Sequence, residues 1–226
     1  MAAVAVAHRG DPYRARENTL PSLRSAVRQG ADAVEFDVRL TRDGVPVLLH
    51  DATLERLWDV ERPLAEVTAE EVRDLTGGGV PTLAEGLTAV CDGSAARPMI
   101  DLPDPAAAPA TVGEVRASGL GGRAYYCGGA PGMLAVRAAD PDAEIALTWT
   151  TLAPPPPALV AAVRPRWLNY RFGLVSGGLV ARLHARGLLV SAWTADTGRT
   201  MKRLLRHGVD SVTTNRIDCL RRVLDG

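Results

Sequence analysis

An α/β fold whose parallel sheet closes into a barrel is predicted by three features of this 226-residue sequence. Short apolar or β-branched runs alternate with longer segments of helical period, which is typical of repeated strand–helix units. About eight or nine such runs occur, close to the eight strands of a TIM (β/α)8 barrel. Polar residues follow the first runs, where the sites of such barrels lie. We therefore expect one barrel domain over residues 1–226.

The predicted strands are short, and a helical segment ending at glycine precedes several of them. The helix expected over Leu20–Gln29 places Leu20, Leu23 and Val27 on one face, and Gly30 ends it. The same design recurs over residues 176–186 and 199–207. The expected strands are 3–7, 33–38, 46–49, 98–102, 124–127, 144–148, 167–169, 188–193 and 211–213.

Two segments interrupt this rhythm. The acidic stretch Glu55–Asp74 predicts an excursion after the strand that ends at His50, with one helix over Ala69–Leu75. We treat residues 53–80 as a small insertion that covers the substrate site. The four prolines of Ala153–Pro157 favour a stiff surface loop over a proline-rich partner motif, because the run occurs once and is not repeated.

Charge and cysteine content exclude several classes of protein. Lys plus Arg and Asp plus Glu both number 26, so no net field draws the chain to nucleic acid or an anionic membrane. Cys91, Cys127 and Cys219 are too few and too scattered for a disulfide framework or a structural zinc site. The N-terminus resembles no signal peptide, and every long apolar stretch is interrupted. We expect a soluble, cytoplasmic protein of unspecified oligomeric state, without nucleic-acid partners or stable membrane insertion.

Polar residues gather at the ends of the first predicted strands. They come from four segments, His8–Arg9, Glu17–Asn18, Glu35–Asp37 and His50–Asp51. Because the carboxyl ends of parallel strands meet on one face of a barrel, we expect the four segments to converge there. This convergence predicts an active site.

Glu35 and Asp37 are two residues apart on one predicted strand, so both side chains should point into the barrel. Two buried carboxylates repel each other unless a cation lies between them, and oxygen ligands suit Mg²⁺ or Ca²⁺. The alternative is a structural ion pair with Arg9 or Arg39. We favour a metal site.

His8 and His50 come from different predicted strands and bracket this carboxylate pair. The unperturbed pKa of histidine is near neutrality, which suits a general acid and a general base on either side of a substrate. A single histidine is more often structural, but this pair beside two carboxylates favours catalysis. His184 and His207 fall within predicted helices and are assigned no function.

The spacing of these motifs resembles one known family, the glycerophosphodiester phosphodiesterases, over nearly the whole chain. The joint order of HRG, ENT, ExD and HD is far more specific than any of these tripeptides or dipeptides alone. The segments that carry the resemblance are HRG at 8–10, ENTLPSL at 17–23, EFDVRLTRDGVPVLLHDATLER at 35–56, PTLAEGL at 81–87, LNYRFGLVSGGLVARLHARGLLVSAWTADT at 168–197 and GVDSVTTNRI at 208–217.

The resemblance implies a TIM barrel that holds one Mg²⁺ or Ca²⁺ ion. It also implies hydrolysis of small glycerophosphodiesters to sn-glycerol 3-phosphate and an alcohol, within lipid and glycerol metabolism. By the matching motifs, His8 and His50 would be the acid–base pair, and Arg9 would hold the phosphate. Glu17 would support the site or the glycerol hydroxyls, and Trp193 would wall the glycerol pocket. Glu35 and Asp37 would be metal ligands.

The later motifs depart from the family pattern. The third metal ligand is usually Glu, followed two residues later by Lys, but this chain has Asp101 and Pro103. Asp101 would then be the third ligand, and a phosphate-binding cation is missing, for which Arg123 or Lys202 could substitute. The usual Ser-Phe at the end of the next strand is replaced by Tyr126, Cys127 and Gly128.

The paired ends of the last two strands also differ. The family's WTVN reads Trp193 to Asp196 here, and its TD pair reads Thr214 and Asn215.

Two alternatives to the hydrolase remain. A related phospholipase D-like lyase would attack phosphorus with an internal hydroxyl and leave a cyclic phosphate. A catalytically weakened barrel would bind a phosphodiester without turning it over, which the changes at Asp101 and Pro103 allow.

Overall fold

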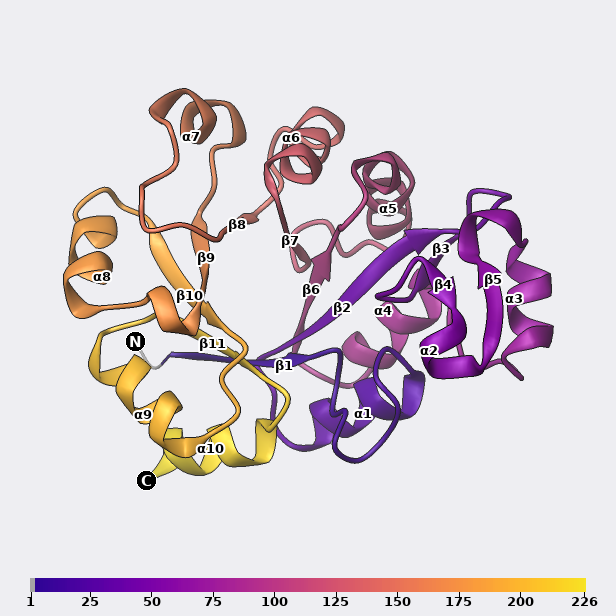
Figure 1. The fold of residues 1–226 in the computed structure, drawn as a ribbon, viewed down its shortest axis with the longest axis horizontal. Helices are drawn as coiled ribbons and strands as arrows, with labels where there is room; N and C mark the ends of the chain where they lie inside the picture. The colour runs from indigo at the N-terminus through magenta and orange to yellow at the C-terminus, as the bar shows by residue number, and fades with distance from the viewer. Residues whose placement is uncertain (1–2) are drawn as a thin grey trace.

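Eight parallel strands close into a barrel in the computed structural model, which describes residues 3–226 (Figure 1). β1 pairs with β2 on one side and with β11 on the other, which closes the ring. The predicted barrel is therefore confirmed. In order around it, the strands are β1 (Val4–His8), β2 (Ala33–Leu40), β6 (Arg97–Asp101), β7 (Tyr125–Gly128), β8 (Ile145–Trp149), β9 (Trp167–Arg171), β10 (Leu189–Trp193) and β11 (Ser211–Thr214).

Helices surround the barrel and cover the outer face of its strands (Figure 1). Several begin at a hydroxyl cap, which satisfies a backbone N–H of the first helical turn. Thr19, Ser176 and Thr197 each accept a hydrogen bond from a backbone N–H in the first turn that follows. The helices are α1 (Leu20–Arg28), α4 (Leu83–Cys91), α5 (Ala108–Ala117), α6 (Ala130–Ala139), α7 (Pro157–Val163), α8 (Gly177–His184), α9 (Gly198–Arg206) and α10 (Ile217–Asp225).

The inside of the barrel has its own small apolar layer beneath the polar site. It includes Val6, Met99, Tyr125 and Trp167, which come from four different strands and are all buried. Because side chains alternate along a strand, the next inward positions toward the carboxyl ends lie directly above this layer. These positions form the floor of the site.

The segment expected as a strand over residues 46–49 is not part of the barrel. β3 (Pro46–Leu48) forms, but it pairs antiparallel with β2. β2 runs three residues beyond Asp37, and the chain then reverses at Thr41–Val45. The prediction that His50 follows a parallel barrel strand is therefore wrong. His50 returns to the barrel rim because Leu49, just before it, donates its backbone N–H to the carbonyl oxygen of Asp37 at 3.1 Å.

The chain after His50 makes the predicted excursion, which lies beside the barrel on the right of Figure 1. It begins with the two-stranded sheet of β4 (Thr53–Leu54) and β5 (Val60–Pro63), with α2 (Glu55–Trp58) between them. A single 3-10 turn then leads into α3 (Ala69–Leu75), which has the bounds predicted for it. Apolar side chains of the excursion and of the segment just before His50 form a separate cluster, made of Val47, Leu49, Leu54, Leu64, Val67, Val72 and Val80.

Other expectations for the chain concern its thiols, the proline run and membrane spans. Cys91, Cys127 and Cys219 are free thiols. The residues of Ala153–Pro156 form no helix or strand, and α7 begins at Pro157. Over residues 3–226, no helix is both long and apolar enough to cross a bilayer.

A substitution at Gly10 can test how tightly the loop after β1 is packed. Its φ is +86°, and a Cβ at this position would lie 2.7 Å from the backbone carbonyl carbon of Ser22. Gly10→Ala should therefore lower the free energy of unfolding by at least ~2 kcal/mol. Gly44→Ala is the matched control, because its φ is +77° but nothing lies within 4 Å of the added Cβ. Urea unfolding that shows equal losses for both variants would contradict the close packing.

Candidate active site

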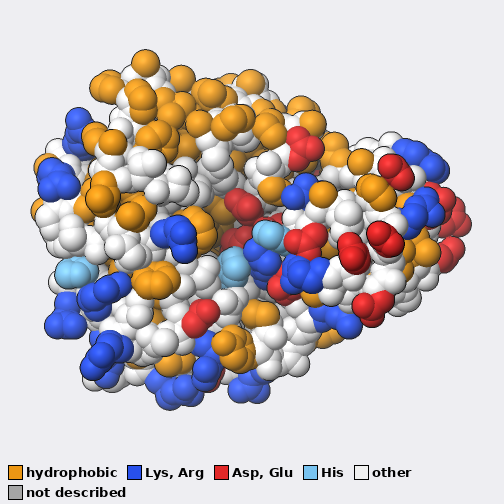
Figure 2. All heavy atoms as spheres, viewed as in Figure 1, with side chains coloured by type: hydrophobic (Ala, Val, Ile, Leu, Met, Phe, Trp, Pro, Cys, Tyr) orange, Lys and Arg blue, Asp and Glu red, His pale blue; other side chains and the backbone are white. Residues whose placement is uncertain are grey.

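A cavity of about 200 Å³ opens among the carboxyl ends of the barrel strands. Figure 2 shows it as a hollow where acidic and histidine side chains gather. All the predicted site residues line it except Glu17, which lies behind Arg9. The lining residues are His8, Arg9, Glu35, Asp37, His50, Met99, Asp101, Cys127, Thr148, Asn169, Trp193 and Thr213.

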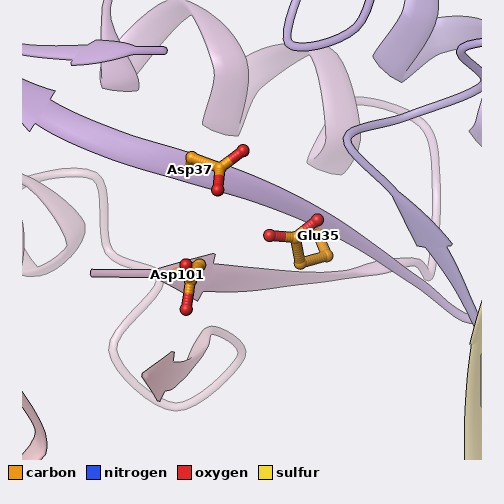
Figure 3. A group of neighbouring side chains, drawn as sticks. All are labelled: Glu35, Asp37 and Asp101. Atoms are coloured by element: carbon orange, nitrogen blue, oxygen red, sulfur yellow. The ribbon is translucent and has the colours of Figure 1, made fainter. Parts of the chain in front are cut away.

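Three carboxylates lie together on one side of this cavity (Figure 3). Glu35 and Asp37 project from β2 and Asp101 from β6, and one oxygen of each lies within 4.8 Å of the others. Asp37 and Asp101 are register partners on adjacent parallel strands, which puts both at the same height in the barrel. Asp101 thus reaches the group despite its short side chain. The three carboxylates could bind a metal ion.

The electrostatics of this group favour a bound cation. Burial raises the pKa of Glu35 well above its usual range, and the charges of Asp37 and Asp101 raise it further. Burial, followed by the charge of Asp37, raises the pKa of Asp101 to about 7. A divalent ion would remove this repulsion and replace the bound protons.

Arg9 and Asn18 hold two of the carboxylates in place. Both residues have a φ of 55°, which turns the loop after β1 back over the strand ends. The Arg9 backbone N–H donates to Glu35 at 2.9 Å, and its Nε lies 3.2 Å from a carboxylate oxygen of Asp37. Asn18 Nδ2 donates to the same oxygen of Asp37 at 2.8 Å. Ion pairing with Arg9, weighed above as the alternative to metal binding, therefore coexists with the carboxylate group.

His8 stands beside Glu35 at the end of β1. Its Nε2 is 3.9 Å from Glu35 Oε2, and its Nδ1 is 2.8 Å from Asn215 Oδ1. Burial, with the neighbouring charge of Arg9, lowers the pKa of His8, although the bond to Asn215 opposes this. Neutral imidazole is thus the favoured form of His8 in the absence of a ligand.

His50 lines the same cavity and belongs to a chain of charged groups. Its Nδ1 is 2.7 Å from Asp51 Oδ1, and its backbone carbonyl accepts a hydrogen bond from Arg39. Asp51 is ion-paired with Arg56 of α2. The predicted alternative pairing of Arg39 with the carboxylates is therefore not found, because Arg39 binds the backbone of His50 instead.

Arg56 connects Asp51, the partner of His50, with Glu17, the partner of Arg9. Its guanidinium contacts Asp51 and also Glu17, at 2.6 Å, and Glu17 in turn accepts from Arg9 at 2.9 Å. Burial opposes ionisation of Glu17, but the hydrogen bonds from Arg56 and Arg9 lower its pKa overall. Glu17 therefore positions Arg9. Arg56 was not identified from the sequence, even though it ends one of the matching motifs.

The phosphate-binding cation missing at Pro103 is not replaced by either candidate. The Arg123 guanidinium donates to the backbone carbonyls of Cys91, Ser94 and Ala96, near the amino end of β6, away from the cavity. Lys202 is exposed on α9. Among the described residues that line the cavity, Arg9 is the single lysine or arginine.

Three further polar groups of the cavity are not among the predicted site residues. Cys127 lines it, and its thiol donates to Asp101 at 3.4 Å, while burial raises the pKa of this thiol. Within the described part of the chain, Asn169 Oδ1 and Thr213 Oγ1 are buried without a hydrogen-bond partner. Both line the cavity, so a ligand that donates hydrogen bonds could satisfy them.

Comparison with known proteins shows the family to which the chain belongs. Residues 8–219 match the model of the glycerophosphoryl diester phosphodiesterase family. The chain belongs to this family. A probable glycerophosphodiester phosphodiesterase 2 from Mycobacterium tuberculosis is 31% identical over 98% of this chain and 90% of its own length. Glycerophosphodiester phosphodiesterase 1 from Rattus norvegicus is 42% identical over 37% of this chain, and the match spans 29% of that relative. The chain thus matches less than a third of the first curated relatives' length.

Solved structures of family members share the fold at low sequence identity. A phosphodiesterase from Oleispira antarctica, in complex with the product sn-glycerol-3-phosphate, superposes with a TM-score of 0.87 at 20% identity and covers 100% of this chain and 98% of its own. The Thermotoga maritima glycerophosphodiester phosphodiesterase gives 0.86 at 21% identity, with 99% of both chains covered. These likenesses support the barrel assignment.

The raised pKa of Asp101 predicts a pH-dependent stability in the absence of divalent ions. Its folded-state pKa of about 7 exceeds the value of ~3.9 in an unfolded chain. The stability contributed by protonated Asp101 is therefore fully present below pH ~4 and is lost as pH rises through about 7. Asp101→Asn imitates the protonated form and should raise the free energy of unfolding at pH 8 by on the order of 2 kcal/mol, with little effect at pH 4.

Chemical denaturation in excess chelator at the two pH values measures this difference. Asp142→Asn is the control, because Asp142 is exposed just before the amino end of β8 and does not line the cavity. An Asp101→Asn effect of the same size at pH 4 and pH 8 would show that Asp101 is not protonated in the metal-free protein.

Proposed function

We propose that this chain is a glycerophosphodiester phosphodiesterase, which hydrolyses glycerophosphodiesters to sn-glycerol 3-phosphate and an alcohol with one divalent cation, Mg²⁺ or Ca²⁺. The observation that carries this proposal is the group of three carboxylates between two histidines in one cavity. Family membership supports the reaction class. The product named for the Oleispira antarctica phosphodiesterase supports the choice of substrate.

Glu35, Asp37 and Asp101 would hold the ion, and their donor set fits a hard cation. With Arg9 as the one guanidinium, the cavity wall would otherwise repel an anionic phosphodiester. A bound divalent ion would neutralise charge on the phosphate oxygens. The remaining steps fall to the protein's own side chains.

His8 and His50 would exchange protons with the reacting groups. They line the same cavity and have different hydrogen-bond partners, an amide oxygen for His8 and a carboxylate for His50. One imidazole would accept the proton of the nucleophile while the other donates a proton to the leaving alcohol oxygen. Arg9, held by Glu17 and Asp37, would bind a phosphate oxygen from a fixed position.

The remaining wall would bind the glycerol part. Trp193 lines the cavity and offers an apolar face, while the unpartnered Asn169 Oδ1 and Thr213 Oγ1 are acceptors for glycerol hydroxyls. We propose further that residues 53–80 are an insertion in a single barrel domain, and that they stabilise His50 through Arg56 and Asp51.

The ion requirement can be tested with a panel of water-soluble glycerophosphodiesters, including glycerophosphocholine and glycerophosphoethanolamine. Turnover should vanish in chelator and return when Mg²⁺ or Ca²⁺ is added, because the carboxylates otherwise repel the substrate. Phosphorus NMR should show glycerol 3-phosphate as the direct product. A cyclic phosphate would assign the chain to the lyase instead, and metal-loaded protein without turnover on any diester would favour the binding barrel.

The histidine roles predict a second result. His8→Ala and His50→Ala should each lower kcat by about 10²-fold or more, because each removes one proton-transfer group. His184→Ala is the matched control, since His184 pairs with Asp210 on the outside of the barrel, away from the cavity. Comparable kcat values for His8→Ala and His184→Ala would remove His8 from the mechanism.

A further inference from the structure

We propose that Asp196 is a positioning residue, which acts through Asn215 to keep the ring proton of His8 on Nδ1 and leave Nε2 facing the carboxylates. Asp196 follows β10 and Asn215 follows β11, the neighbouring strand of the barrel (Figure 1). Neither side chain lines the cavity. The effect on turnover rests on the proposed function, but the position of the proton does not.

The argument begins at Asp196, because an ionised carboxylate can only accept hydrogen bonds. Asp196 Oδ1 accepts from the backbone N–H of Asn215 at 2.8 Å and from the hydroxyl of Thr214 at 3.1 Å. Its Oδ2 accepts from Asn215 Nδ2 at 2.8 Å. The nitrogen of the Asn215 side-chain amide must therefore point toward Asp196.

The amide oxygen of Asn215 then points the other way, toward His8. Asn215 Oδ1 lies 2.8 Å from His8 Nδ1, and an amide oxygen has no proton to donate. His8 must supply the proton, so Nδ1 is the protonated nitrogen of the neutral ring. Nε2, which lies 3.9 Å from Glu35 Oε2, is left as an acceptor on the side of the carboxylates.

Replacing one carboxylate oxygen of Asp196 by an NH₂ group should move the ring proton of His8 from Nδ1 to Nε2. In Asp196→Asn, the new side-chain oxygen must stay with the backbone N–H of Asn215, which cannot turn away. The new NH₂ group would then face Asn215 Nδ2, donor against donor. The Asn215 amide relieves this conflict by turning over, so that it offers NH₂ to His8 Nδ1 and moves the ring proton to Nε2.

Exchanging the two residues should restore the original state. In Asp196→Asn/Asn215→Asp, the carboxylate at position 215 accepts both from the amide at position 196 and from His8 Nδ1. Every donor in the group again meets an acceptor, and the proton stays on Nδ1. A purely structural role for Asp196 would not predict a return of the tautomer.

The test is ¹⁵N NMR of the His8 ring in the full chain at pH 8, with circular dichroism to confirm folding. The wild type and the exchanged double variant should show the Nδ1–H tautomer, and Asp196→Asn should show Nε2–H. The kcat of Asp196→Asn should fall by about 10²-fold with a smaller change in KM, since Nε2 can no longer accept a proton, and the double variant should recover most of it.

Asp210→Asn is the matched control. Asp210 also binds a histidine, His184 at 2.7 Å, and a backbone N–H, that of Val190, but outside the cavity. It should change neither the His8 tautomer nor kcat. A wild-type His8 with its proton on Nε2 would overturn the inference, as would an Asp196→Asn variant that keeps Nδ1–H. If Asp196→Asn does not fold, the His8 tautomers of the wild type and of the double variant still test the inference.

If the His8 tautomers are as expected but neither the wild type nor any variant turns over a diester, the proposed function fails and the positioning role of Asp196 stands.

Discussion

The repulsion between three carboxylates is the interaction on which the rest of the site depends. Glu35, Asp37 and Asp101 come from adjacent strands of a closed sheet, so they cannot separate without breaking the ladder between β2 and β6. Arg9 and Asn18 partly balance them through backbone and side-chain N–H groups. The barrel thus holds three carboxylates together against their mutual repulsion, and such a group could bind a metal ion.

Much of the barrel could be predicted because its signals are local. The period of the apolar residues marks strands and helices, and the two-residue spacing of Glu35 and Asp37 already implies that both point inward. The antiparallel direction of β3 cannot be predicted from the residues of this strand alone, and its signal is the Asp43-Gly44 turn before it. A run such as Pro46–Leu48 is short and apolar, and its composition is the same whether it enters a barrel or folds back on β2. Direction is decided by the turn at Thr41–Val45, where the Thr41 hydroxyl accepts a hydrogen bond from the Val45 backbone N–H at 3.1 Å and Gly44 has a φ of +77°.

The partners of the predicted site residues were the less predictable part. His8 could be recognised from the sequence, but its contact with Asn215 joins positions 207 residues apart. Register between strands also decided the position of Asp101. Its side chain is shorter than that of the usual Glu, and pairing with Asp37 across the sheet brings it to the group. Such contacts depend on the closed ring and leave no trace in local spacing.

Because β2 and β3 form a hairpin, His8 and His50 are held by different parts of the structure. His8 ends a strand of the barrel ring, whereas His50 follows Val47 and Leu49, which pack in the small separate cluster of the excursion. A cluster of this size opens at a lower free energy than the main core. Partial opening of the excursion would release His50 and leave the barrel, His8 and the three carboxylates intact. A local fluctuation of the excursion would therefore displace the imidazole of His50 while the three carboxylates stay together on β2 and β6.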